Sequence, residues 1–379
     1  MCTRRCELLF LFIFVALFQS RATNAAQVSK QVDSMGRDYY LFTPDKMDPR
    51  VTYWLVAEVH GYGGQGSPAS PVRAWADRGD CIAVAPSFPN NGYQMLGLNS
   101  DQQLIQIFQK LRKDFKLHDK LFVYGHSGGA QYAHRFALKY PQWAAGCCAT
   151  SAGTWSTGAS YGTLNDSAST VPIAISCGES DSGRAFATAP MTRIEWARKF
   201  EQALANAGFF YKASYWPNTG HEGNGEGNAQ LANEAFSLGT TGLVGKDRAN
   251  FDAKMKVLYD YAQVGDFGKA LTGGGNLLGQ MKLRTPTQAA DNLAAAGWHA
   301  GPPAVSACVQ ATKEYVAEQM ARLSFDVQNA ALYKIAALEN EGSPQSSIKL
   351  RSIYNTFAGW TKVRVAVTQA AHRMQTKLQ

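Results

Sequence analysis

The sequence predicts an α/β protein: a mainly parallel sheet with helices on both faces, followed by an all-helical C-terminal domain. Two observations carry this prediction. Short apolar, β-prone runs alternate with helix-length segments over residues 27–241, as expected for parallel strands that are buried on both faces. Over residues 242–379 the helical spacing of apolar residues continues, while strand-like runs become rare. We therefore expect two domains in this chain of 379 residues.

The composition is that of a globular protein, with 45% hydrophobic and 17% charged residues. The formal net charge is +8, and the basic surplus lies in the C-terminal part, where Glu341 is the last acidic residue. Such spaced basic residues are suited to binding an anionic surface or, more simply, they form the solvated face of a helix. We take the second interpretation and expect no nucleic-acid partner.

The N-terminus has the three parts of a secretory signal peptide. Basic residues precede the apolar run Leu8–Phe18, and Thr23–Ala26 offers small residues for cleavage after Ala25 or Ala26. The run is too short to span a bilayer comfortably, and no later stretch is suited to do so. We expect removal of residues 1–26 and a secreted or periplasmic protein without stable membrane insertion; an uncleaved anchor is the alternative.

Cys2 and Cys6 would leave with the signal peptide. The remaining cysteines lie mostly in or beside apolar, strand-like runs, where cysteine commonly serves as a small core residue: Cys81, Cys147, Cys148, Cys177 and Cys308. Their odd number leaves at least one free thiol, so we expect no disulfide framework, although an oxidising compartment permits one bridge.

Strands are expected where an apolar, β-prone run ends in glycine, proline or a polar loop. These runs are Asp38–Pro44, Val51–His60, Cys81–Pro86, Leu121–Tyr124, Ala144–Thr150, Val171–Cys177 and Phe210–Trp216. Helices are expected where apolar residues form one stripe. In the first domain these are Asn99–Asp114, the segment from Ala130 onward, Met191–Ala207 and Ala229–Leu238. In the second they are Phe251–Ala262, Phe267–Met281, Thr287–Ala296, Val305–Asn340 and Ile348–Lys377, the last interrupted near Gly359.

The stretch Lys120–Leu138 organises the first domain. A short apolar strand leads into GHSGG at Gly125–Gly129, and helix-forming residues follow. Strand, G-x-S-x-G and helix together predict a nucleophile elbow, in which the hydroxyl of Ser127 stands in strained backbone at the start of a helix. The alternative is a glycine-rich turn that carries an ordinary serine.

A serine hydroxyl needs a base that takes its proton, and the base needs an orienting carboxylate. Ser127, Asp181 and His221 each follow an expected strand and occur in the order nucleophile, acid, histidine. We predict that they form a catalytic triad. Glu179, in the same loop as Asp181, is the alternative acid.

Two other histidines compete with His221 for the role of base. His126 lies inside the elbow, with its ring expected to point away from the serine, and His134 lies about two turns along the next helix. Both are interpreted as structural. His221 beside Glu222 also fits an ordinary loop residue or a metal ligand, but no H-E-x-x-H or paired-cysteine motif supports a metal. We expect neither a metal nor a cofactor.

A tetrahedral intermediate needs N–H donors that point at its oxyanion. One expected donor is Gly128, the residue after the serine. Tyr62, in the glycine-rich turn after the second strand, offers the other, with Gly63 as the alternative. Trp155 and Trp216 lie in loops at the same edge of the sheet, so they are expected to bind an acyl or aromatic group unless they are packing residues.

Four motifs resemble those of the α/β-hydrolase family: HGYGG at His60–Gly64, GHSGG at Gly125–Gly129, GESD at Gly178–Asp181 and GH at Gly220–His221. More narrowly, they are similar to the secreted poly(3-hydroxybutyrate) depolymerase-like and feruloyl-esterase-like branch. The resemblance implies hydrolysis of small or polymeric carboxylic esters through an acyl-enzyme, without a cofactor. Cutinase-type, peptidase-type and acetyl-xylan-esterase-type activities share these motifs, and the helical region matches no recognisable polymer-binding module.

The sequence therefore predicts an exported serine esterase that acts through Ser127. The first alternative is a serine peptidase of the prolyl-oligopeptidase type, although the propeller that usually precedes such a domain is missing. The second is a non-catalytic, hydrolase-like binding protein in which the helical domain carries the function.

Overall fold

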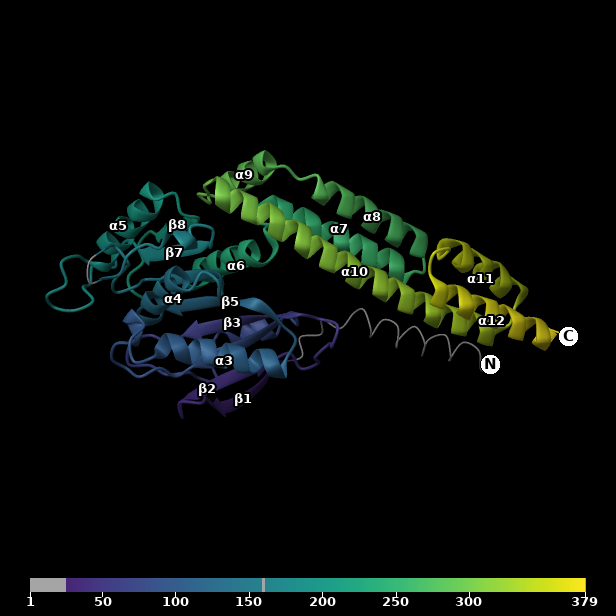
Figure 1. The fold of residues 1–379 in the computed structure, drawn as a ribbon, viewed down its shortest axis with the longest axis horizontal. Coiled ribbons are helices and arrows are strands. Elements are labelled where there is room, and N and C mark those ends of the chain that lie inside the picture. Colours follow the sequence, from purple (N-terminus) through teal and green to yellow (C-terminus); the bar gives the residue numbers. More distant parts are fainter. Residues whose placement is uncertain (1–24, 159–160, 379) are drawn as a thin grey trace. The chain divides into compact units, whose positions relative to one another are not determined.

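The computed structural model describes residues 25–158 and 161–378, and these residues divide into two compact units (Figure 1). The sheet unit comprises residues 25–245 and 285–312, and the helical unit comprises residues 246–284 and 313–378. The predicted signal peptide lies outside the described residues except for its last two positions.

The sheet has eight strands in the spatial order β1-β2-β4-β3-β5-β6-β7-β8. β2 pairs antiparallel with both of its neighbours, and the other pairings are parallel. The strands are β1 (Gln27–Val32), β2 (Asp38–Thr43), β3 (Tyr53–Val59), β4 (Cys81–Pro86), β5 (Leu117–His126), β6 (Ala144–Thr150), β7 (Ile173–Gly178) and β8 (Tyr211–Trp216). This mainly parallel sheet confirms the predicted fold class.

Helices cover both faces of the sheet because β3 to β7 carry apolar side chains on both sides (Figure 1). One face packs against α3 (Ser100–Asp114), α4 (Gly128–Lys139) and α5 (Arg193–Asn206). The other packs against the short α2 (Arg73–Ala76) and against α6 (Gly225–Thr241). Two 3₁₀ turns, Tyr93–Met95 and Asp166–Ala168, lie in the connecting loops.

β1 and the beginning of β5 were not predicted. β1 is polar and exposed along almost its whole length, so it has no apolar alternation, and it forms by pairing with β2 at the edge of the sheet. β5 begins at Leu117, four residues before the apolar run, because Leu117 pairs with Tyr53 of β3. Both differences come from pairing with a strand elsewhere in the sequence, which a local sequence pattern cannot predict.

Residues 285–312, which the sequence placed in the helical domain, pack in the sheet unit. They include α9 (Pro286–Ala295) and the beginning of α10 (Pro302–Glu341). Trp298, 3% exposed, packs edge-on against Phe210, and the backbone of His299 exchanges hydrogen bonds of 3.0 and 2.8 Å with Tyr211. The segment is helical, as expected, but its apolar side chains complete the core beneath the sheet.

The helical unit contains α7 (Gly245–Gln263), α8 (Phe267–Lys282), the rest of α10, α11 (Pro344–Thr356) and α12 (Thr361–Leu378). Buried residues recur at helical spacing in α10, as at Val316, Met320, Leu323 and Val327. The helical C-terminal region and its break near Gly359 agree with the prediction. Among the described residues, no helix has the length and apolar character that a membrane crossing requires.

Candidate active site

Ser127 lies in the tight turn between β5 and α4. Its backbone has φ 55° and ψ −113°, a conformation that costs a non-glycine residue about 1–3 kcal/mol. The flanking glycines explain how the turn fits. A Cβ at Gly129 would lie 1.9 Å from the carbonyl oxygen of Val59, and one at Gly125 would lie 2.4 Å from the carbonyl oxygen of Gly129. The turn therefore has the strained geometry expected of a nucleophile elbow.

The structure brings Ser127, His221 and Asp181 together from three strand ends. His221 Nε2 lies 3.0 Å from Ser127 Oγ, and its Nδ1 lies 2.9 Å from Asp181 Oδ2. An ionised carboxylate only accepts hydrogen bonds, so Nδ1 carries the proton and Nε2 is free to accept the one from the serine hydroxyl. The Asp181 side chain is 2% exposed and that of His221 is 38% exposed, so the imidazole links a buried carboxylate to an accessible hydroxyl.

Asp181, rather than Glu179, contacts the histidine. Glu179 is exposed and pairs with Arg198 at 3.7 Å. A residue that the sequence did not single out lies beside the other oxygen of Asp181: Arg193 Nη1 is 3.6 Å from Oδ1. Arg193 is the first residue of α5, where the helix dipole disfavours a cation. A basic residue at the start of an expected helix is the one feature of the sequence that could have drawn attention to Arg193.

The backbone of Tyr62 lies close to that of Gly128. A Cβ added to Gly128 would be 2.7 Å from the Tyr62 nitrogen, so only glycine allows this approach. The phenol of Tyr62 points elsewhere: the residue is 67% exposed, and its hydroxyl donates to Asn91 Oδ1 at 3.2 Å. The backbone of this turn, and not the Tyr62 side chain, therefore faces the elbow.

His60 fixes the turn that carries Tyr62. Its Nε2 accepts a hydrogen bond from the Phe88 amide at 3.0 Å, which leaves Nδ1–H to donate to the Gly61 carbonyl at 2.8 Å. Burial lowers the pKa of His60, in agreement with this neutral tautomer. The hydroxyl of Tyr93 donates to the His60 carbonyl at 2.7 Å. His60 therefore orders the turn through both ring nitrogens.

The two predicted pocket tryptophans make internal contacts. Trp155 is fully buried and stacked on Phe200, with 5.1 Å between ring centroids, so its ring has no exposed surface to present to a substrate. Trp216 is half-buried, and its Nε1 donates to Asn228 Oδ1 at 2.8 Å. Its ring lies against Gly227, where a Cβ would come within 2.6 Å.

The two rival histidines occupy different surroundings. His134 is fully buried; its Nδ1 donates to the Ala130 carbonyl at 2.7 Å, and its Nε2 accepts from the Ser156 amide at 3.1 Å. His126 is half-buried, and its ring lies beside that of His221, with 5.1 Å between centroids. Neither is hydrogen-bonded to Ser127 in place of His221, whose Nε2 occupies that position.

Arg135, on α4, was also not singled out from the sequence. Its guanidinium is buried and donates to backbone carbonyls of Gln131, Thr154 and Tyr161, and to the Thr154 hydroxyl. Burial lowers its pKa to about 9, so the group still carries its charge at neutral pH. Arg135 thus ties the loop after β6 to the helix that follows the elbow.

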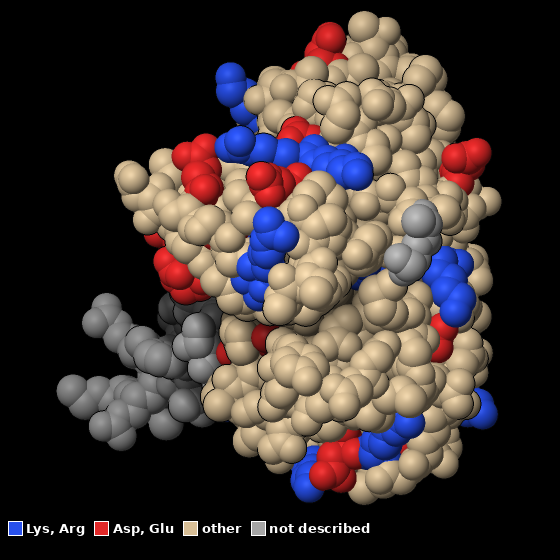
Figure 2. Space-filling model, turned by 90° about the vertical axis from the view of Figure 1, so that its left-hand side faces the viewer, with Lys and Arg blue, Asp and Glu red and all other residues tan. Residues whose placement is uncertain are grey.

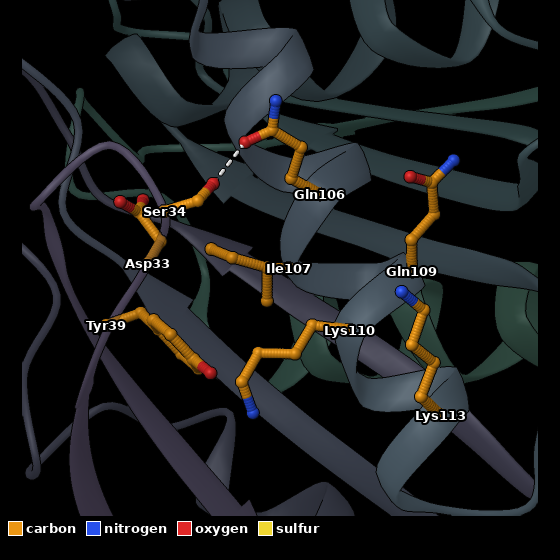
Figure 3. Close-up of a pocket in the computed structure, with 8 residues that line it drawn as sticks. All are labelled: Asp33, Ser34, Tyr39, Gln106, Ile107, Gln109, Lys110 and Lys113. Atoms are coloured by element: carbon orange, nitrogen blue, oxygen red, sulfur yellow. Dashed lines mark hydrogen bonds between the residues drawn. The ribbon is translucent and has the colours of Figure 1, made fainter.

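A cavity of about 290 Å³ lies away from these residues, between the turn after β1 and helix α3 (Figure 3). Its lining includes Asp33, Lys110 and Lys113, and in the same wall Ser34 donates to Gln106 at 2.6 Å. It contains no predicted site residue. Within the described part of the chain, no cluster of three or more histidine, cysteine or acidic side chains is arranged to hold a metal ion.

No family model and no curated protein matches this chain. Among solved structures, it is similar to a thermostable esterase (18% identity, TM-score 0.43), covering 55% of this chain and 62% of the esterase. It is also similar to a poly(3-hydroxybutyrate) depolymerase from Bordetella parapertussis (18%, TM-score 0.41, 59% and 92% of the two chains). A third is a ferulic acid esterase from Anaeromyces mucronatus (15%, TM-score 0.44, 57% and 90%). The chain thus spans less than two thirds of the thermostable esterase, and at these identities the likeness concerns the fold alone.

Proposed function

We propose that this protein is an exported serine hydrolase that cleaves carboxylic esters through an acyl-enzyme on Ser127. The observation that carries the proposal is the continuous hydrogen-bonded series from Asp181 through His221 to Ser127, at 2.9 and 3.0 Å. Nucleophile, base and orienting acid are each within the distance that proton transfer requires.

In the acylation step, His221 Nε2 takes the hydroxyl proton as Ser127 Oγ forms a bond to the ester carbonyl carbon. The buried carboxylate of Asp181 stabilises the imidazolium through Nδ1–H. When the tetrahedral intermediate collapses, the ester C–O bond breaks and the alcohol leaves with the proton from Nε2. Water, deprotonated by the same nitrogen, then attacks the acyl-enzyme and releases the acid.

The oxyanion would be held by the backbone amides of Gly128 and Tyr62. The close approach of the Tyr62 backbone to Gly128, which tolerates no side chain there, supports this assignment. Gly128 is also the first residue of α4, where the helix dipole favours negative charge. In comparable enzymes one such donor contributes about 3–4 kcal/mol to stabilising the transition state.

Two further features bear on the substrate and the location. Figure 2 shows one face of the molecule, on which basic and acidic side chains are interspersed around a broad uncharged area. On this face the mixed sign provides no strong steering for a polyanionic substrate. We also propose that the protein is exported and that its signal peptide is removed, as the sequence pattern suggests. Of the two expected cleavage sites we favour the one after Ala25, because Ala26 is 2% exposed and its nitrogen lies 2.6 Å from Asp77 Oδ1.

The experiment compares wild-type protein with Ser127→Ala and with a matched control, Ser151→Ala. Ser151 also follows a strand and has a positive φ of 51°, but it is fully buried and cannot reach a substrate. We expect hydrolysis of p-nitrophenyl acetate or butyrate to fall by at least about a thousandfold in Ser127→Ala and to persist in Ser151→Ala. Circular dichroism of each variant verifies the fold.

Labelling by a fluorophosphonate provides a second measurement, because it reports an activated serine whatever the preferred ester. We expect one label per chain, on Ser127, in the wild type and in Ser151→Ala. A wild type that neither turns over esters nor takes up the label would refute the proposal. Labelling without ester turnover, but with cleavage of an amide, would move the assignment to a peptidase.

A further inference from the structure

The two carboxylate oxygens of Asp181, whose side chain is 2% exposed, have different partners. Oδ2 lies 2.9 Å from His221 Nδ1, and the thiol of Cys177 lies 3.9 Å from the same oxygen. Oδ1 faces Arg193, whose Nη1 is 3.6 Å away. Within the described ranges, no other lysine or arginine lies within ion-pair distance of Asp181. The buried acid thus has the histidine on one oxygen and one permanent cation beside the other.

Arg193 stands where an isolated cation is unfavourable. It is the first residue of α5, at the positive end of the helix dipole. Its side chain is 19% exposed, and in the described part of the chain its Nε is buried without a hydrogen-bond partner. Burying a guanidinium with an unsatisfied N–H costs free energy, which attraction to a buried carboxylate can offset. Asp181 is the group that provides this attraction.

Two backbone hydrogen bonds join the acid loop to the start of α5. The amide of Arg193 donates to the Gly183 carbonyl at 3.0 Å, and that of Ile194 donates to the Asp181 carbonyl at 3.3 Å. A Cβ at Gly183 would lie 2.6 Å from Arg193 Nη1 and 3.8 Å from Asp181 Oδ1, so the absence of a side chain there leaves room for the ion pair. The backbone bonds fix the main chain of the loop, but they do not determine how the carboxylate is turned about its side-chain bonds.

We propose that Arg193 is a positioning residue of the catalytic site: its charge holds the carboxylate of Asp181 turned so that Oδ2 meets His221 Nδ1. The inference rests on the function proposed above and adds a residue to it. A carboxylate held in this orientation keeps the proton on Nδ1 and leaves Nε2 to accept the proton of Ser127. Arg193 therefore acts on the base through the acid.

The test uses Arg193→Met, which removes the charge and keeps an unbranched side chain, and Arg193→Lys, which keeps the charge. Arg198→Met is the matched control. It makes the same substitution further along the same helix, in an exposed ion pair of 3.7 Å with Glu179, the other acid of this loop. We expect Arg193→Met to lower kcat by about 10- to 100-fold, since small misplacements of a catalytic group have that effect. KM should stay within about twofold, because Arg193 contacts the acid and not the serine.

Arg193→Lys should recover most of the loss, because a lysine also places a cation beside Oδ1, and Arg198→Met should keep the wild-type kcat. A folded Arg193→Met with kcat within about threefold of wild type would overturn the proposal. So would an Arg193→Lys variant as slow as Arg193→Met, because the charge would then have no part in the effect. If Arg193→Met does not fold, Arg193→Gln, which loses the charge but keeps N–H donors, is judged by the same limits.

A second readout needs no substrate. The proton on His221 Nδ1, shared with Asp181 Oδ2, should give a downfield line in the ¹H spectrum, identified by its loss in His221→Ala. We expect the line in wild type, in Arg193→Lys and in Arg198→Met, and its loss or broadening in Arg193→Met. If the wild type turns over no ester, the proposed function fails, and this line alone decides the role of Arg193. An unchanged line in Arg193→Met, or no line in wild type, contradicts that role.

Discussion

His134 makes the stability of the sheet unit depend on pH. The ring is fully buried, and both nitrogens are used, one as donor to Ala130 and one as acceptor from Ser156. Burial, and then the charge of Arg135, lower the pKa of His134 well below its ordinary value. A proton added to Nε2 would face the N–H of Ser156 and remove a hydrogen bond. The folded protein therefore excludes a proton that the unfolded chain accepts.

The magnitude follows from linkage. In the unfolded chain a histidine has a pKa of about 6.5, so at about pH 5 it is almost fully protonated. Because the folded ring stays neutral while the unfolded chain takes up the proton, the free energy of unfolding falls by RT ln(1 + 10^1.5), or about 2 kcal/mol, between about pH 7.5 and pH 5. The sign follows because the unfolded state binds the extra proton: stability is full above the unfolded pKa and is lost as the pH falls through it.

The assay compares urea unfolding of wild type and His134→Gln at the two pH values. Tryptophan fluorescence reports mainly the sheet unit, because of the eight tryptophans only Trp360 lies in the helical unit. The substitution lowers stability at both pH values, but the wild type should lose about 2 kcal/mol more than the variant on acidification. His60 and His126, whose pKa values burial also lowers, are present in both proteins and cancel in the comparison.

Equal acid losses in the two proteins, to within about 0.5 kcal/mol, would refute the reasoning. If His134→Gln does not fold, the chemical shift of the His134 ring carbons in wild type decides instead. That shift should stay at its neutral value down to about pH 5. A titration midpoint near 6.5 would show that the buried ring accepts a proton without penalty.

Three further predictions concern packing, thiols and the N-terminus. Gly129→Ala should lower the free energy of unfolding by about 3 kcal/mol or more and abolish turnover, because its Cβ would lie 1.9 Å from the Val59 carbonyl oxygen. Gly275→Ala, at a position of α8 with open space around it, should instead raise the melting temperature in thermal unfolding. The five cysteines described are buried thiols, so a thiol reagent should find none of them in native protein and five after denaturation, or seven if the signal peptide is retained. N-terminal sequencing of secreted protein should begin at Ala26, whose side chain is 2% exposed and whose nitrogen lies 2.6 Å from Asp77 Oδ1; a later start would contradict this reading.

The order of strands, elbow and helices was predictable because each depends on local pattern. Continuous apolar runs in β4, β6 and β7 identify buried parallel strands, and the G-x-S-x-G motif between a strand and a helix identifies the turn at Ser127. The spacing of Asp181 and His221 after their strands was sufficient to predict that they meet.

The remaining features of the site depend on tertiary contacts. Arg193 pairs with Asp181 because α5 begins beside the loop that carries Asp181. The rings of His126 and His221 are in contact because the elbow and the loop after β8 lie at the same edge of the sheet. Trp155, in the loop after β6, is buried against Phe200, which comes from α5. None of these contacts belongs to a local sequence pattern.

Residues 285–312 belong to the sheet unit but lie in the sequence between two segments of the helical unit, and this limits how the chain can be divided. A protein cut after Gly245 would lack Trp298, which packs on Phe210 and donates to Glu234 at 3.2 Å. The same cut would leave the strand edge at Tyr211 without the backbone partner it has in His299. A single deletion therefore cannot remove the helical unit without also removing part of the sheet unit. Exchanging the helical unit between proteins requires two junctions, one on each side of the segment 285–312.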